Sequence, residues 1–137
     1  MLDDALYQAY RATDYTVHAP SPFTLRIGAQ SAECDALLAT HGVTSAAFLT
    51  AWNPFSQPLP DAENRAAQAL LAADLDMVST AIFPGEGKGE IGDWPPEPSL
   101  FALGIPEACA TRLAQAYRQN AYVWIAQGQP ARLVICV

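Results

Sequence analysis

Polar side chains that could bind a ligand gather in the stretch 50–65, whose sequence is TAWNPFSQPLPDAENR. Asn53 follows an apolar run that ends at Trp52, and ligands bind at such strand ends when helices cover the faces of a sheet. Asn64 falls on the inward face of the helix predicted next, and Arg65 could hold an anion through two parallel hydrogen bonds. Because an apolar cleft with a few convergent polar groups is typical of a small-ligand site, these four residues are the first candidates.

Three further candidates lie in irregular segments elsewhere in the chain, namely Trp94, Glu97 and Asn120. If Glu97 faces the same cleft, an apolar wall and the Trp94 ring would raise the pKa of its carboxyl group. A carboxyl group of that kind can act as a general acid or base. Arg65 and the Asn amides would then hold developing negative charge, as an active site requires.

Each of these residues also has a structural interpretation, which stays open. Asn53 could make an Asx turn, Asn64 could complete the cap of its helix, and Arg65 could pair with a loop carboxylate. Asn120 stands just past a predicted helix, where it could adopt a left-handed cap conformation. The pattern alone does not choose between a binding site and a set of turn and cap residues.

The glycine-rich stretch 87–92 fits the pattern G-x-G-x-x-G and follows a predicted strand. A dinucleotide site needs a helix to begin there, so that its first amides meet the pyrophosphate. The residues that follow are DWPP, which do not begin a normal helix. We therefore expect the stretch 84–98 to be an acidic surface loop, and we expect no cofactor.

The cysteines do not form the pattern of a metal site or a disulfide framework. Cys34, Cys109 and Cys136 are odd in number and show no C-x-x-C spacing. The two histidines, His18 and His41, are far apart in the chain and have apolar neighbours, which favours structural roles. We therefore expect no metal site.

Length and charge narrow the class of protein. A chain of 137 residues predicts one domain over residues 1–137, and a hydrophobic content of 51% excludes intrinsic disorder. The net charge of -7 argues against binding to nucleic acid or to an anionic membrane, because both need clustered cations. The acidic N-terminus and the lack of a long apolar run lead us to expect a cytoplasmic protein without a membrane segment.

The hydrophobic periodicity predicts the helices and strands that would position the candidate residues. Helical spacing predicts helices at 3–13, 31–41, 61–75 and 106–119. Strand patterns occupy 15–19, 23–28, 44–52, 78–83, 99–103, 121–126 and 131–137. This order predicts an α+β fold, with a mixed sheet of five to seven strands and three or four helices packed on it.

Five short segments together resemble a family of small bacterial proteins catalogued as domain of unknown function 3293. The resemblance runs from about residue 7 to residue 134, and it implies a single bacterial domain without an assigned activity. It brings no catalytic residues, but it directs attention to Asn53, Asn64, Arg65 and Glu97. The segments that carry it are YRAT followed by Tyr15, TAWNP at 50–54, ENR at 63–65, EPS at 97–99 and QNAY at 119–122.

Three functions remain open from the sequence. The first is a binding or regulatory module whose cleft takes a small polar or anionic ligand or a peptide, which the lack of a clear nucleophile favours. The second is a small enzyme with Glu97 as general acid or base and Arg65 with the Asn amides stabilising an anion. The third is a protein-interaction subunit that uses an exposed edge strand of the C-terminal hairpin. We expect a monomer or a weak homodimer.

Overall fold

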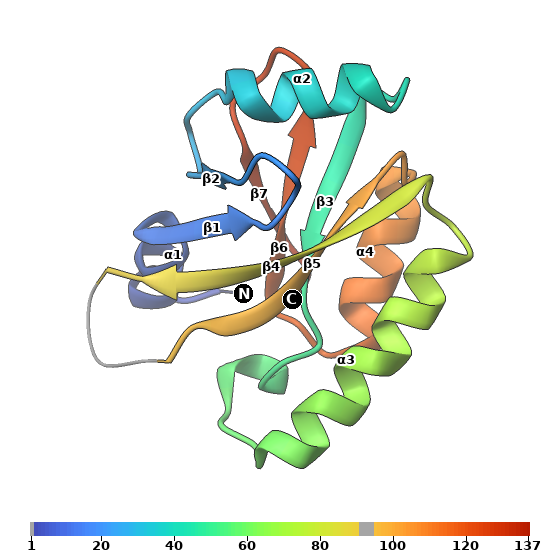
Figure 1. The fold of residues 1–137 in the computed structure, drawn as a ribbon. Helices are drawn as coiled ribbons and strands as arrows, with labels where there is room; N and C mark the ends of the chain where they lie inside the picture. The colour runs from blue at the N-terminus through green and yellow to red at the C-terminus, as the bar shows by residue number, and fades with distance from the viewer. Residues whose placement is uncertain (1, 91–94) are drawn as a thin grey trace.

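The structure is a computed structural model that describes residues 2–90 and 95–137. In these residues four α-helices pack on a seven-stranded sheet with the strand order β2-β1-β4-β5-β3-β6-β7 (Figure 1). The predicted α+β fold is therefore confirmed. Neighbouring strands of the described chain pair antiparallel, and an isolated parallel bridge joins Ile27 to Ala131.

The elements follow the predicted order closely. The helices are α1 Asp4–Arg11, α2 Ala32–Thr40, α3 Asp61–Asp76 and α4 Glu107–Ala116, with a short 3-10 turn η1 at Pro54–Ser56. The strands are β1 Thr13–Val17, β2 Phe23–Leu25, β3 Ser45–Leu49, β4 Ala81–Gly89, β5 Glu97–Leu103, β6 Ala121–Ala126 and β7 Arg132–Ile135. Within the described residues no helix is both long and apolar enough to cross a membrane.

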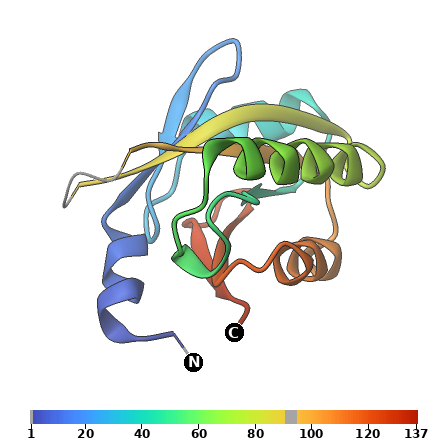
Figure 2. The ribbon, with the colours of Figure 1, turned by 90° about the horizontal axis from the view of Figure 1, so that it is seen from below.

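The sheet curls until its two edges meet. Beyond β2, the Gly28 amide donates to the Ala131 carbonyl at 2.8 Å, and the Ala131 amide donates to the Ala29 carbonyl at 3.0 Å. These bonds join the β2 end of the sheet to the start of β7 and give the sheet an inner and an outer face. In Figure 2, β6 and β7 lie between α1 on one side and α4 on the other.

Side chains alternate between the two faces, as they do in any strand, and each face has its own core. The inner core joins residues of both edges and includes Cys34 and Leu38 of α2, which are fully buried. The outer core lies under α3 and α4 and includes Leu71, Leu75 and Ala114. The helix α1 contributes to neither core.

The expected surface loop at 84–98 is wrong for residues 84–89 and 97–98, which lie in strands. The strand β4 continues to Gly89 and β5 begins at Glu97, while residues 91–94 lie outside the described part of the chain. Glycine and proline disfavour a strand locally, but β4 has a hydrogen-bonded partner on each side, β1 and β5. Long-range pairing therefore overrides local propensity here.

Candidate functional site

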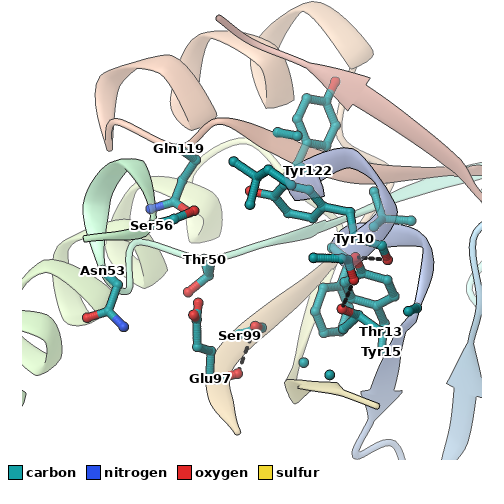
Figure 3. Close-up of a pocket in the computed structure, with 18 of the residues that line it drawn as sticks. Tyr10, Thr13, Tyr15, Thr50, Asn53, Ser56, Glu97, Ser99, Gln119 and Tyr122 are labelled. Carbon is teal, nitrogen blue, oxygen red and sulfur yellow. Dashed lines mark hydrogen bonds between the residues drawn. The ribbon is translucent and has the colours of Figure 1, made fainter. Parts of the chain in front are cut away.

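A cavity of about 410 Å³ lies between α1 and the inner face of the sheet. That volume is within the usual range of small-molecule sites. Its apolar wall includes Leu6 and Ala9 of α1, Phe48 of β3 and Val123 of β6. The lining also includes the polar and aromatic residues labelled in Figure 3: Tyr10, Thr13, Tyr15, Thr50, Asn53, Ser56, Glu97, Ser99, Gln119 and Tyr122.

A stripe of glycines creates part of this space. Gly85, Gly87 and Gly89 occupy alternate positions of β4, so they share the face of the sheet that forms the cavity floor. Gly87 stands between Tyr15 of β1 and Glu97 of β5 in the strand register, and it places no side chain between them. The G-x-G pattern of the sequence therefore belongs to a strand, where it leaves room.

The glycines of the stripe differ in what they tolerate. A Cβ at Gly85 would stand 2.5 Å from the Thr16 carbonyl oxygen and 2.9 Å from the Phe48 ring, so only glycine fits. A Cβ at Gly87 would meet nothing closer than 3.7 Å, which is an ordinary contact. A larger side chain at position 87 would consequently project into the cavity without a backbone clash.

Glu97 presents the only carboxylate of the described lining besides Glu90. Glu97 is the first residue of β5. Every second residue of a strand points to the same face, so the Glu97 side chain lies on the inner face with those of Ser99 and Phe101. Figure 3 shows its carboxylate pointing toward Thr50. No described residue forms a hydrogen bond or an ion pair with this carboxylate, and burial raises the pKa of Glu97 to about 7. The group can therefore change its charge near neutral pH.

Tyr10 brings α1 into the same polar group. Its side chain lies near Ser56 and Asn120, and the Asn120 amide donates to Ser56 Oγ at 3.1 Å. Burial raises the pKa of Tyr10, and the nearby charge of Glu97 raises it further. Tyr10 of α1 and Ser56 of η1 thus line the same cavity, and Asn120 holds Ser56 from behind.

Two amides one helical turn apart on α3 hold the end of β3 in place. The Asn64 side chain accepts from the Asn53 amide at 2.9 Å and donates to Asn53 Oδ1 at 2.7 Å. Gln68 Oε1 accepts from the Ala51 amide at 2.8 Å, and Gln68 Nε2 donates to the Pro98 carbonyl at 3.2 Å. Because Pro98 adjoins Glu97, α3 positions both strand ends that meet at the cavity.

The segment that Asn64 holds carries unusual backbone conformations. Asn53, Phe55 and Ser56 have positive φ angles of 46°, 53° and 59°. A bulky residue such as Phe55 rarely adopts this region, and its amide is held by the Arg118 carbonyl at 2.7 Å. Strained backbone of this kind clusters at functional sites, and here two of the strained residues line the cavity.

Some of the predicted site residues line the cavity, and others lie behind its lining. Asn53 and Glu97 line the cavity. Asn64, with 1% of its surface exposed, and Asn120 lie behind the lining and bind residues of it. Trp52 also lies behind, where its carbonyl accepts from Gln119 at 3.3 Å. The inward orientation expected for Asn64 is thereby confirmed.

The structure does not bring Arg65 to the cavity. Its side chain is 72% exposed and lies 3.6 Å from Asp61 on the same helix, so the pairing with a carboxylate is local. Trp94 lies outside the described residues. None of the described lining residues is a lysine or an arginine.

Several lining residues with polar side chains were not among the sequence candidates, and they include Tyr10, Thr50, Ser56 and Gln119. Tyr10, Thr50 and Gln119 lie within the segments that carry the family resemblance, and that signal could have identified them. Ser56 has no comparable signal. In the described residues no group of three or more His, Cys, Asp or Glu side chains could hold a metal ion.

The site and fold place the chain among α+β proteins with an internal pocket at one end of a curled sheet. Residues 49–122, which make up just over half of the chain, match the family described as protein of unknown function (DUF3293). The chain belongs to this family. The match includes Asn53, Asn64, Glu97 and Asn120, whereas α1 and β1 precede it. No curated protein and no solved structure matched the chain.

Proposed function

We propose that this protein is a binding module for a small organic molecule that occupies the cavity beneath α1. The observation that carries the proposal is an apolar cavity of about 410 Å³ whose few polar groups converge from α1, η1, β5 and the start of β6. Most pockets that bind small molecules combine such a wall with a few placed polar groups.

The state of α1 supports a ligand rather than a simple packing defect. None of the eight described residues of α1 is buried, although Leu6 and Ala9 face the cavity. The helix is nevertheless held at its C-terminal end, where the Tyr15 hydroxyl donates to the Tyr10 carbonyl at 2.8 Å and Thr13 Oγ1 donates to the Ala9 carbonyl at 2.7 Å. An apolar ligand would cover the apolar face that the protein leaves open.

The lining also sets the chemistry of the ligand. Aromatic and aliphatic walls favour a planar or branched apolar body. The hydroxyl of Tyr10 and the amide oxygen of Gln119 offer hydrogen bonds at one end, whereas the Thr50 hydroxyl already donates to the Pro98 carbonyl at 2.8 Å. A compound of about a dozen heavy atoms with one polar group matches this cavity in size and polarity.

The proposal is tested by filling the cavity from its floor. In Gly87→Ile the new side chain would occupy the space between Tyr15 and Glu97. We expect wild-type protein to bind 2-naphthylmethanol in isothermal titration calorimetry and Gly87→Ile to lose at least about tenfold in affinity. The matched control is Lys88→Ile, which adds the same side chain to the exposed neighbouring position and should bind as wild type does.

Circular dichroism must show that Gly87→Ile is folded, and its melting temperature should not fall, because isoleucine favours a strand more than glycine does. Equal binding by Gly87→Ile and Lys88→Ile would show that the probe binds elsewhere. That result would overturn the proposal.

Acid-base catalysis at the same site is a second candidate function, favoured by the pKa of about 7 for Glu97. This catalysis would not require Arg65, because Tyr10 and Gln119 could hold a polar group of a substrate beside the Glu97 carboxyl group. A Glu97→Gln variant would separate the two functions, since a catalyst would lose turnover while a neutral compound stayed bound.

Interaction through an edge strand has less support than the sequence suggested. The start of β7 is already joined to Gly28 and Ala29 through Ala131, so that part of the edge is occupied. The part of β7 beyond Ala131 would have to supply the contact with a partner.

A further inference from the structure

We infer that the natural ligand of the cavity is an organic cation, an amine with an apolar or aromatic body whose ammonium group pairs with Glu97. This inference rests on the proposed binding function and adds the charge class of the ligand. The observation that carries it is the Glu97 carboxylate, which has no ion-pair partner among the described residues and lies in an apolar cavity whose described lining contains no basic side chain.

The charges around the cavity favour a cation. Two carboxylates line it, and Glu90 already has a partner, because its Oε1 lies 3.2 Å from Nη1 of Arg26. Arg26 also binds Asp14 at 2.9 Å. Glu97 has no ion-pair partner among the described residues. A cationic ligand would therefore supply the one opposite charge that this site lacks.

Aromatic rings surround the place where the cation would lie. Tyr10, Tyr15 and Phe48 line the cavity, whereas the ring of Tyr122 belongs to the outer core, with its hydroxyl 2.8 Å from Thr111 Oγ1. The Tyr15 hydroxyl is used on the Tyr10 carbonyl, which leaves its ring as the surface offered to the cavity. Ammonium groups are attracted to the faces of such rings, and desolvation strengthens the attraction. A carboxylate with aromatic walls is thus a chemically matched pair of contacts for an amine.

Most of the groups that face Glu97 keep their charge state near pH 7. Tyr10 from α1 and Tyr15 from β1 both have a raised pKa because of burial, so they stay neutral near pH 7. Glu90 is the other acid of the described lining. The residue after β3, η1 and the segment before β6 contribute Thr50, Ser56 and Gln119, which do not titrate. Protonation of Glu97 should then control binding of a cation.

Three probes of similar shape separate the charge classes: 2-naphthylmethylamine, 2-naphthylmethanol and 2-naphthoate. Isothermal titration calorimetry is run at a pH of about 6 and of about 8, on either side of the pKa of Glu97. The ionised fraction rises about tenfold between these values, so the affinity for the amine should rise about tenfold. The alcohol should change by less than about twofold, and the naphthoate should bind more weakly than either.

Glu97→Gln keeps the shape of the side chain and removes its charge. At the higher pH we expect this variant to bind the amine at least about tenfold more weakly, to lose the pH dependence, and to bind the alcohol within about twofold of wild type. The matched control is Glu86→Gln, which removes an equal charge next to His18 and outside the described cavity lining. This control should leave all three affinities unchanged.

The outcomes separate this inference from the function on which it rests. If the alcohol binds in the cavity while the amine binds no better at the higher pH, or if Glu97→Gln leaves amine binding unchanged, the ligand is not selected as a cation. The inference is then wrong and the binding function stands. If none of the three probes binds and Gly87→Ile changes nothing, both are wrong.

Discussion

The helices α1 and α2 belong to the same inner layer of the molecule, yet they meet the sheet in different ways. Each begins with a side-chain cap: Asp3 Oδ1 accepts from the Leu6 amide at 2.8 Å, and Ser31 Oγ accepts from the Cys34 amide at 3.1 Å. The helix α2 buries Cys34 and Leu38 completely, whereas α1 buries none of its described residues. The two helices therefore have similar N-terminal caps, and they differ in how many of their side chains are buried against the sheet.

The strands beneath the two helices explain this contrast. Under α2 the inner face presents large side chains of β2 and β3, and they form one continuous core with Leu38. Under α1 a cavity remains, and its lining includes the small residues Ala5 and Ala9 of α1 and Gly87 and Gly89 of β4. Two surfaces of small residues cannot fill the space between them. One end of the inner layer thus serves stability, and the other is available for a ligand.

The largest expected effect separates the two helices by stability. We expect Leu38→Ala in α2 to lower the free energy of unfolding by about 2 to 5 kcal/mol, because it empties a fully buried site. Leu6→Ala in α1 should lower it by less than about 1 kcal/mol, since Leu6 faces an open cavity. Urea denaturation of both variants measures the difference. Equal losses would show that α1 is as much a part of the core as α2.

The next effect concerns the cavity end alone and depends on pH. Because the pKa of Glu97 is raised from 4.5 to about 7 in the folded protein, folding favours the protonated carboxyl group. Its contribution to stability is complete below the unfolded pKa and is lost as the pH rises to about 7.

We expect the free energy of unfolding of wild type, relative to that of Glu97→Gln, to fall by up to about 3 kcal/mol across that window. Urea denaturation at several pH values measures this difference, and Glu86→Gln serves as the control for a lost surface charge. A pH dependence identical in wild type and Glu97→Gln would mean that Glu97 titrates as an exposed group.

The smallest effect tests the support behind the cavity. Asn64→Ala removes the acceptor of the Asn53 amide and the donor to Asn53 Oδ1, so we expect a loss of about 2 kcal/mol. The neighbouring variant Arg65→Ala should change stability by less than about 0.5 kcal/mol, because its exposed ion pair with Asp61 contributes little. Thermal or urea unfolding measures both. A larger loss in Arg65→Ala would contradict the assignment of Asn64 as the positioning residue.

The sequence predicted the elements better than the site. Helical spacing located α2 and α3, and the inward position of Asn64 followed from the same spacing. Strand alternation in residues 97–103 could also have placed Glu97 beside Ser99 and Phe101 on one face. The expectation for Arg65 rested on its neighbours in sequence, and its position on the solvent side of α3 separates it from the cavity.

Residue types and their periodicity thus determined by themselves the α+β class, the order of the elements and the polar segment at the end of β3. The cavity depended on tertiary structure. The glycines of β4 form a stripe only when residues 81–89 are a strand, and that strand is stabilised by pairing with β1 and β5, which are distant in the chain. Such pairing brings Tyr15, Gly87 and Glu97 into one row, and no local pattern in the sequence specifies that contact.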